Sequence, residues 1–466
     1  MTLPAGQISL SEVNVELNLS PTATISLNDA AVRSLAGVPS GAIAMSNLQG
    51  KSNNPFFFGS LYPSTVSGQQ ILADSSGNIY QQNILGPGSS KAQVIKINNT
   101  GVIQWQRQVT SPSLDYPSVN SVGMALDSSS NTYAAGLSGN NIYIWKYNSS
   151  GTLQWQKKLG DDVNTTYIGG TGVGTLAIDS GGNLVLVMAN IGNRIGAMKV
   201  NSSGATQWQS QMSPSGLTNT QADCIATDSS SNVYFAGYSY DSGFSLTLGK
   251  FDSSGTAQWL RRGANAEFFG GWGRGVGTDS SGNVYVASLG SSSTTILLKY
   301  DSSGTNLWAT RFALGATGDN TPASIAVDSS GNSYIFGRGG TEGYFVVKYN
   351  SSGTIQWQRS VVASAGSYMV AVGIGLSADG ATFYINGRDN ASSTSLFAKL
   401  PTDGSKTGTF TVNGATYTYA ATSLAVSASN LTLSSVTPNG GSFSRANTTS
   451  SFTDSASTRS IAVTNV

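Results

Sequence analysis

Short runs of apolar residues alternate with tight turns along most of the chain, and the arrangement recurs about every fifty residues. In the copy that spans residues 324–359, four short runs are separated by the turns Asp328–Asn332 and Asn350–Gly353. Both turns have Asp or Asn first and Gly fourth, which caps a type I turn and completes a hairpin with a left-handed residue. The pattern therefore predicts a repeating unit of four antiparallel strands.

Two sequence templates mark these units. The template Lys-x4-Gly-x3-Trp begins at Lys96, Lys146, Lys199, Lys250, Lys299 and Lys348, and a seventh copy at Lys399 has Gly408 in place of Trp. The template Asp-Ser-Ser-Gly-Asn, or a close variant, begins at Asp74, Asp127, Asp179, Asp228, Asp279 and Asp328, with Ser377 in the seventh copy. We expect slight strain at Ser130 and Ser231, which replace the turn glycine in two copies.

Seven such units predict an all-β fold, a seven-bladed β-propeller of four-stranded blades over residues 55–410. A thin sheet exposes two faces, and stacking the sheets radially in a closed ring buries both. The segment Phe56–Tyr62 precedes the first unit at the offset of an outermost strand, and the seventh unit lacks its Trp. We therefore expect residues 55–62 to pair with the seventh blade and latch the ring, with residues near Phe410 as the alternative.

The alternation of Asp-Ser-Ser-Gly-Asn-x-Tyr with Lys-Tyr-Asn-Ser-Ser-Gly-Thr-x-x-Trp resembles the bacterial seven-bladed β-propeller repeat family. The resemblance covers about residues 56–410 and is specific for the fold. It implies little about function, because propellers serve many roles.

The first 54 residues differ from the repeats, and we interpret them as a helical N-terminal docking segment. Ser9 and Glu12 form a capping box that opens a short helix through Leu17. Ser26–Asp29 opens a second helix that ends at Gly37, and residues 43–48 predict a third turn before Gly50. Helices this short are expected to bury too little surface alone. They are either a cap on the propeller or an adaptor that folds against another protein.

The phrases at residues 6–17, 25–37 and 50–52 resemble a segment at the front of tail and other virion proteins of bacteriophages. The resemblance implies a virion component whose N-terminus docks on other virion proteins and whose propeller is displayed outward.

Residues 411–466 are rich in Thr, Ser, Asn and Val and predict a C-terminal β-rich extension. This extension forms a small β-module, adds a sheet to the propeller, or supplies strands that pair between subunits.

Composition removes several classes of chemistry. The chain has no His and one Cys, so His-based triads, intrachain disulfides and the usual zinc sites are excluded. Its formal net charge is +1, which gives no electrostatic reason to expect binding to nucleic acid or to an anionic membrane. The beginning of the sequence lacks the pattern of a secretory signal, and no apolar run is long enough to span a membrane. We expect no cofactor, no metal and synthesis in the host cytoplasm, with the virion as final location.

The recurring residues are interpreted as structural. Each repeated Lys is expected to pair with the Asp of the first turn or to cover apolar surface with its stem, in preference to forming a functional ring. Each Trp is expected to pack between sheets, in preference to stacking on a sugar. The turns that begin with Asp lack the alternating carboxylates that calcium needs, so their Asp residues are interpreted as caps of the turn backbone. Cys224 is expected to be a buried small hydrophobe.

Both short turns of every unit fall on one face of a propeller, and the longer, variable links fall on the other, called here the long-loop face. Its exposed aromatics and charges are the candidate partner-binding residues. They are Tyr116, Tyr167, Tyr238, Tyr240, Glu267, Phe268, Phe269, Trp272, Arg274, Arg338, Tyr368 and Arg388.

The favoured hypothesis is a non-enzymatic virion protein, a tail fibre or tail-associated adhesin whose long-loop face binds a host-surface glycan or receptor, or another virion protein. A purely structural decoration or neck protein is the alternative in the same class.

A glycan-cleaving tail enzyme needs paired carboxylates, and Asp161, Asp162, Asp241 and Glu267 are the candidates. Only Glu267 and Glu342 are glutamates within the propeller repeats, so this class is less favoured. An intracellular scaffold is the third class, and the resemblance of the N-terminus disfavours it.

Overall fold

A computed structural model gives the fold. It describes residues 3, 7–17, 20, 22–36, 40–48, 57–62, 66–85, 91–110, 120–138, 141–159, 175–188, 194–214, 219–240, 243–263, 273–291, 294–313, 320–339, 343–364, 369–390, 394–412, 414–422, 425–428, 433–436, 438–442, 447–449, 453–456 and 460–465. The chain divides into two compact units, Met1–Phe56 with Asn465–Val466, and Phe57–Thr464.

The N-terminal unit contains the helices α1 (Leu10–Glu16) and α2 (Ala30–Ala36) and the 3-10 helix η1 (Met45–Leu48). The predicted capping box is confirmed, because the Ser9 amide donates to Glu12 Oε2 at 2.6 Å and the Glu12 amide donates to Ser9 Oγ at 3.2 Å. The short helices do not form a core by themselves, as expected. Connecting segments complete a core of their own, formed by Leu3, Val13, Val32, Leu35, Ala36 and Leu48, with Ile8, Leu17, Ile25, Leu27, Ile43 and Met45 packed against it.

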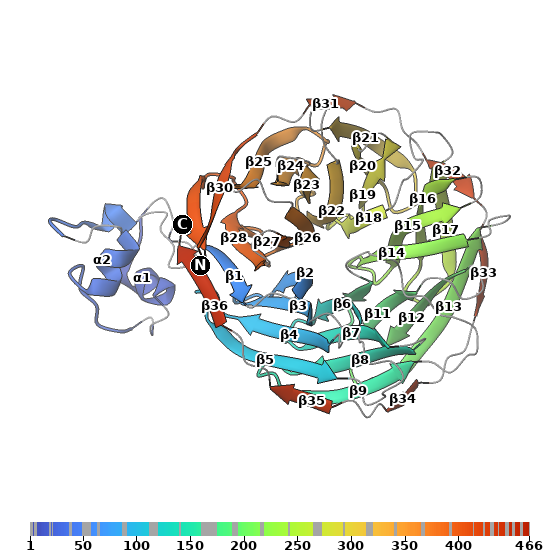
Figure 1. The fold of residues 1–466 in the computed structure, drawn as a ribbon, viewed down its shortest axis with the longest axis horizontal. Coiled ribbons are helices and arrows are strands. Elements are labelled where there is room, and N and C mark those ends of the chain that lie inside the picture. Colours follow the sequence, from blue (N-terminus) through green and yellow to red (C-terminus); the bar gives the residue numbers. More distant parts are fainter. Residues whose placement is uncertain are drawn as a thin grey trace. The chain divides into compact units, whose positions relative to one another are not determined.

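The second unit is a seven-bladed β-propeller of antiparallel sheets around one axis (Figure 1). Blades 1 to 7 are numbered in chain order, and the repeat strands of each are given from the axis outward. Blade 1 has β2 (Val66–Ala73), β3 (Ile79–Leu85), β4 (Lys91–Ile97) and β5 (Ile103–Thr110); blade 2 has β6 (Asn120–Leu126), β7 (Thr132–Ser138), β8 (Asn141–Tyr147) and β9 (Leu153–Leu159); blade 3 has β10 (Leu176–Ile178), β11 (Leu184–Met188), β12 (Ile195–Val200) and β13 (Thr206–Pro214); blade 4 has β14 (Asn219–Thr227), β15 (Val233–Tyr240), β16 (Phe244–Phe251) and β17 (Ala257–Gly263).

The remaining blades follow the same plan. Blade 5 has β18 (Gly273–Thr278), β19 (Val284–Gly290), β20 (Thr294–Tyr300) and β21 (Asn306–Ala313); blade 6 has β22 (Asn320–Val327), β23 (Ser333–Gly339), β24 (Gly343–Tyr349) and β25 (Ile355–Ala363); blade 7 has β26 (Met369–Leu376), β27 (Thr382–Asp389), β28 (Thr394–Pro401) and, as its fourth strand, β1 (Phe57–Tyr62). Side chains of neighbouring blades interlock in apolar clusters, which bury the faces of the sheets.

The predicted latch is confirmed, because β1 pairs antiparallel with β28 and so joins the two ends of the ring. Phe57 lies opposite Lys399, the register that Trp105 has opposite Lys96 in blade 1. The alternative closure near Phe410 is wrong. Phe410 lies on β29 (Gly408–Val412), which joins blade 6, and its ring stacks on Phe58 at a centroid distance of 4.8 Å.

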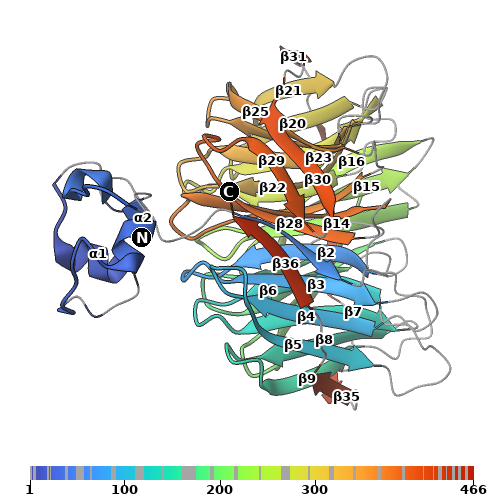
Figure 2. The ribbon, with the colours of Figure 1, turned by 60° about the vertical axis from the view of Figure 1, so that its left-hand side comes forward.

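The C-terminal segment adds an outer strand to every blade. Together the strands β30 to β36 are called here the belt, and Figures 1 and 2 show them outside the ring in orange and red. They are β30 (Ala415–Ala421) on blade 6, β31 (Ala425–Ala428) on blade 5, β32 (Leu433–Val436) on blade 4, β33 (Pro438–Ser442) on blade 3, β34 (Asn447–Thr449) on blade 2, β35 (Thr453–Ala456) on blade 1 and β36 (Ser460–Asn465) beside β1 on blade 7. The belt therefore passes the blades in the reverse of their chain order.

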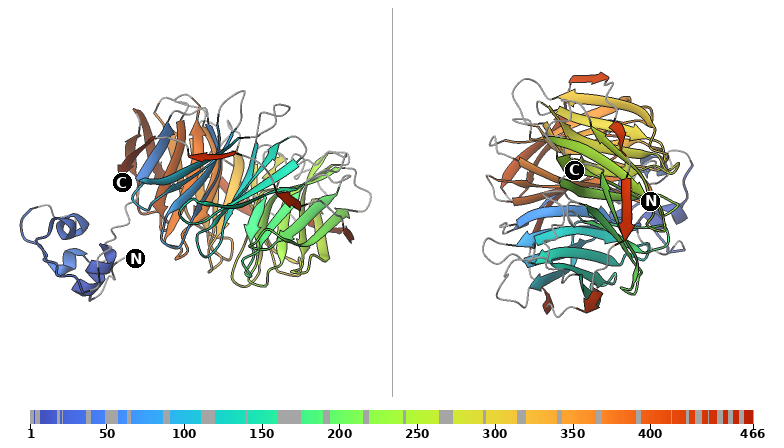
Figure 3. Two further views of the ribbon diagram at one scale, coloured as in Figure 1. Left: turned by 90° about the horizontal axis from the view of Figure 1, so that it is seen from below. Right: turned by 90° about the vertical axis from the view of Figure 1, so that its right-hand side faces the viewer.

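The belt keeps a constant register with the ring. The residue two positions after each repeat Trp faces a belt residue, and successive belt partners are seven residues apart: Arg359 with Ala421, Thr310 with Ala428, Arg261 with Ser435, Ser210 with Ser442, Lys157 with Thr449 and Arg107 with Ala456. Seven residues span at most about 25 Å when extended. One further step of seven reaches Val463, which lies on β36. Figure 3 shows the belt strands crossing the outside of the ring from two further directions.

The two hairpin turns of each blade close at the same end of the ring, as predicted, since β2–β3 and β4–β5 are antiparallel pairs. Their glycines have positive φ, for example 75° at Gly77 and 88° at Gly101. Ser130 and Ser231 replace such a glycine and hold φ angles of 61° and 60°. The strain predicted at these two serines is therefore present in the backbone.

Candidate functional site

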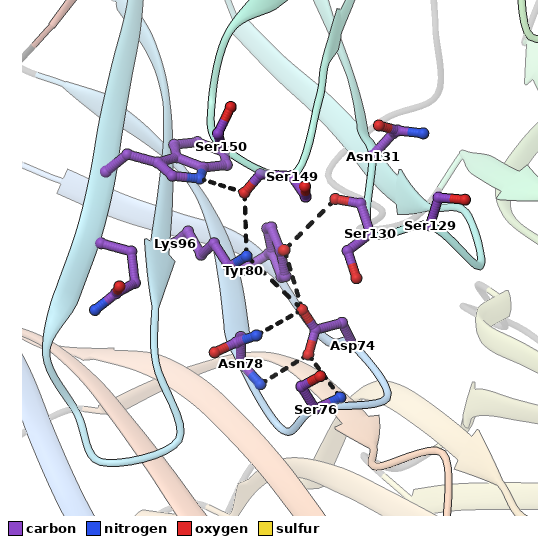
Figure 4. A network of polar contacts seen from close by, with 12 residues as sticks. Asp74, Ser76, Asn78, Tyr80, Lys96, Ser129, Ser130, Asn131, Ser149 and Ser150 are labelled. Carbon is purple, nitrogen blue, oxygen red and sulfur yellow. Dashed lines mark hydrogen bonds and ion pairs between the residues drawn. The ribbon is translucent and has the colours of Figure 1, made fainter. Parts of the chain in front are cut away.

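The repeated Lys and Trp residues join each blade to the next one. In blade 1, Lys96 Nζ and Trp105 Nε1 both donate to the backbone carbonyl of Ser149 in blade 2, each at 3.1 Å (Figure 4). The same lysine lies 4.0 Å from Asp74 Oδ2 and covers the ring of Tyr80 at 5.2 Å. Burial raises the pKa of the Tyr80 hydroxyl, which donates to Asp74.

This arrangement recurs around the ring. A lysine donates to a carbonyl of the next blade, at 3.0–3.1 Å, in the pairs Lys146–Ser202, Lys250–Ser302, Lys299–Ser351, Lys348–Thr402 and Lys399–Asn99. A Trp shares that acceptor at Ser202, Ser302, Ser351 and Thr402. Lys199–Asp179 and Lys299–Asp279 are further ion pairs of the predicted kind. The structural interpretation of these residues is confirmed.

Five of the predicted partner-binding residues lie in the described part of the chain: Tyr238, Tyr240, Arg274, Arg338 and Arg388. Each is at the end of its strand farthest from the short turns, so all five belong to the long-loop face. The other seven lie outside the described residues: Tyr116, Tyr167, Glu267, Phe268, Phe269, Trp272 and Tyr368.

Blade 4 carries an aromatic group at this face. The ring of Phe244 meets those of Tyr238 and Tyr240, each at a centroid distance of 5.1 Å. The Tyr238 hydroxyl donates to Gln221, which anchors the group, and Tyr240 is 40% exposed. Phe244 was not among the predicted residues, because it begins a strand and shows no loop character in the sequence. The group offers an exposed aromatic edge on a rigid base.

A buried carboxyl group lies two residues along β14 from Gln221. Asp223 is the residue at the bulge in β14, and Arg274 holds the bulge position of β18 in the next blade. Burial raises the pKa of Asp223 to about 7, and the charge of Arg274 limits the rise. Burial also raises the pKa of the neighbouring Cys224 thiol, which is 3% exposed, so its predicted role as a buried small residue is confirmed.

The two remaining arginines lie on other blades. Arg338 is on β23 of blade 6, and Arg388 is on β27 of blade 7, opposite Ser395. Next to Arg388, the buried Asp389 accepts a hydrogen bond of 2.9 Å from Tyr417 of blade 6. The five residues therefore share a face but do not converge on one point.

A group of buried amides also lies toward the long-loop end, between blades 7 and 1: Gln81, Asn83, Gln93 and Asn386. The turns and the Lys–Trp template do not reveal these amides, because both patterns leave out the interiors of the strands. Aligning the second strand of each repeat would have marked Gln81 and Asn386 as departures from a mostly apolar pattern.

In the described residues, no group of three or more Cys, Asp or Glu side chains is arranged to hold a metal ion. Among those residues there is also no helix with the length and apolar character needed to cross a membrane.

Comparison with known proteins agrees with the fold. Residues 307–342 match the family model described as Beta-propeller repeat. The chain folds as a β-propeller, and its seven blades are repeats of one pattern. No curated protein sequence matches the chain.

Several solved structures are similar to the chain at low identity. Sqt1 from Chaetomium thermophilum is 10% identical, with a TM-score of 0.46 over 73% of this chain and 96% of that one. The Dos1 propeller is 11% identical, with a TM-score of 0.44 over 72% and 78% of the two chains. NanB sialidase from Streptococcus pneumoniae is 12% identical, with a TM-score of 0.37 over 75% and 68%. Identities this low concern the fold alone and carry no argument about activity.

Proposed function

We propose that this protein is a bacteriophage virion component, a tail fibre or tail-associated adhesin. Its N-terminal unit docks on the particle, and the long-loop face binds the host surface or a neighbouring virion protein. The observation that carries the proposal is the N-terminal unit: it has a buried core of its own, and its sequence phrases resemble the front of phage virion proteins. A unit with its own core suits attachment to a separate partner.

The contrast between the two faces supports the assignment of recognition to the long-loop face. The short-turn face repeats the same Ser, Gly and Asn residues in blade after blade. The long-loop face differs between blades, and the Tyr238–Tyr240–Phe244 group on blade 4 exposes aromatic surface. Exposed aromatic residues on a rigid base are enriched in recognition surfaces.

The closure of the ring supports a role outside the cell. Strand β1 joins blade 7 to the start of the propeller, and the belt pairs with the outer strand of each blade. A particle appendage must stay folded away from chaperones, and a ring fastened by main-chain pairing meets that need.

Two measurements test the proposal. Mass spectrometry of purified phage particles is expected to find this chain, and its absence from particles contradicts the proposal. Purified full-length protein added to host cells is expected to slow phage adsorption, because it occupies the same surface. Tyr240→Ser should weaken this inhibition several-fold.

The control variant is Val102→Ser. Val102 is 57% exposed and follows a short turn, so it lies at the opposite end of the blade. Its substitution should leave inhibition unchanged. Particles that contain the chain, together with protein that never inhibits adsorption, would favour the purely structural decoration or neck role.

A further inference from the structure

We propose that the junction between blades 7 and 1 is a binding site for one sugar unit, which rests on the proposed recognition role of the long-loop face. Four buried amide side chains meet there. Gln81, Asn83 and Gln93 of blade 1 are each 0% exposed, and Asn386 of blade 7 is 1% exposed.

Register and contacts show that these side chains point into the same junction. Gln81 Nε2 donates a 3.0 Å hydrogen bond to Ser395 Oγ of blade 7, so this face of β3 is turned toward blade 7. Asn83, two residues further, shares that face and lies opposite Gln93 on β4. From the other side, Asn386 lies opposite Phe397, which packs with Ile71 and Ile95 of blade 1.

Six polar atoms in this junction make no hydrogen bond within the described part of the chain. Gln81 Oε1 and both amide atoms of Asn83 and of Asn386 are buried and make no hydrogen bond among the described residues, and the same holds for Arg388 Nε. They amount to three acceptors and three donors. Burying such atoms without partners costs free energy, so the junction is suited to a ligand that supplies both kinds of group.

The fold does not require amides at these positions. The residues that occupy the register of Gln81 in the other blades are Ala134, Leu186, Phe235, Val286, Ile335 and Ile385. The register of Asn386 holds Ala135, Val187, Ala236, Ala287 and Phe336 in blades 2 to 6. At these two registers the junction of blades 1 and 2 holds one amide, Gln82, and the other junctions hold apolar residues. The gathering of amides between blades 7 and 1 therefore points to a ligand.

A sugar matches the junction in chemistry. Each hydroxyl group donates and accepts, as the paired amide atoms of Asn83 and Asn386 require. The apolar Phe397 lies opposite Asn386 on the neighbouring strand, and the partly exposed Arg388 stands at the long-loop end of the same face of blade 7. Arg388 also gives a sugar that bears a carboxylate a charge-assisted hydrogen bond.

The experiment uses the full chain and saturation-transfer NMR with glucose, galactose, mannose, rhamnose, N-acetylglucosamine and glucuronic acid. At least one of these sugars is expected to bind. Gln81→Val and Asn386→Ala introduce the residues that blade 5 has at these positions, Val286 and Ala287, so both variants should fold. Each is expected to weaken binding at least about tenfold, because a polar partner is lost on each side.

Gln82→Ala is the matched control. Gln82 is the next residue on β3, but its Nε2 donates to Ala135 of blade 2, in the neighbouring junction. Its variant should bind as the parent does. The inference is overturned if no sugar of the panel binds the folded protein, or if binding is the same in Gln81→Val and Asn386→Ala as in Gln82→Ala.

These outcomes separate the site from the proposed function. If Gln81→Val inhibits phage adsorption as the parent does and no sugar binds, the sugar site is contradicted and the virion role remains supported. If sugar binding depends on Gln81 and Asn386 but the protein is absent from particles, the sugar site is supported and the virion role is contradicted.

Discussion

The ammonium group of Lys399 donates a 3.0 Å hydrogen bond to the backbone carbonyl of Asn99, 300 positions away in the sequence. This bond crosses the closure between blade 7 and blade 1. At other junctions the corresponding carbonyl also accepts from a Trp indole, but the seventh repeat has Gly408 at that place in the template. Lys399 is therefore a principal side-chain link at the closure.

Lys399→Met keeps the apolar stem and removes the donor. Lys399 is completely buried, so we expect its variant to lose about 2–3 kcal/mol of unfolding free energy. Lys250→Met is the control, because Trp259 Nε1 still donates to Ser302 at 3.2 Å in that junction, and we expect a loss of about 1 kcal/mol or less. Urea denaturation followed by tryptophan fluorescence measures both. Equal losses would show that the closure depends no more on its lysine than other junctions do.

The serines at positive φ are sites for stabilisation. Ser130→Gly and Ser231→Gly relieve a left-handed conformation that glycine adopts freely, and each should raise the free energy of unfolding by about 1 kcal/mol. Ser129→Gly and Ser230→Gly change the preceding residue, which is not at positive φ, and should give no gain. Thermal unfolding compares the four variants, and a gain in all of them would assign the effect to something other than φ.

Asp223 predicts a dependence of stability on pH. Its pKa in the folded protein, about 7, lies above the ordinary value of 3.8, so the folded state retains a proton that the unfolded state loses. This group's contribution to stability is therefore complete below about pH 4 and falls as the pH rises toward 7. Asn is a neutral substitute for the protonated carboxyl group.

Asp223→Asn should consequently be more stable than the parent at pH 8, by up to about 4 kcal/mol, and similar to it at pH 4. Melting temperatures across this range measure the difference. A variant that is less stable than the parent at pH 8 would show that the attraction of Arg274 outweighs the cost of burying the charge.

The belt predicts what truncation does. Removing residues 425–466 leaves β30 on blade 6 and uncovers the outer main-chain edge of blades 5, 4, 3, 2, 1 and 7. Exposed edges invite pairing with other chains, so the truncated protein should unfold at a lower temperature and associate in light-scattering measurements. A truncated protein that stays monomeric and keeps the melting temperature of the parent would show that the ring is stable without the belt.

Much of the ring was predictable because its repeated residues each serve one geometric purpose. Asp74 caps its turn, Gly77 completes it, and Lys96 and Trp105 reach the same carbonyl of the next blade, so the template survives in copy after copy. The latch was predictable because Phe57 stands where the offset of the repeat requires a fourth strand.

The belt was not predictable in the same way. Its strands pair through the main chain, which makes no demand on side-chain pattern, and several are only three or four residues long. The seven-residue spacing from Ala421 to Ala456 becomes visible only when the outer edge of each blade is known. The aromatic group on blade 4 likewise depends on Phe244, whose neighbours in space come from the adjacent strand.

The C-terminal segment encircles its own ring in a fixed register. The double variant Ser210→Cys with Ser442→Cys, made with Cys224→Ala, tests it directly, since these two residues lie opposite each other on blade 3. Mild oxidation followed by peptide mass spectrometry is expected to find an intramolecular 210–442 disulfide. Ser210→Cys with Thr449→Cys, one step of seven further along the belt, should form none. Failure of the first pair to link, equal linking of the second, or links only between chains would contradict the account.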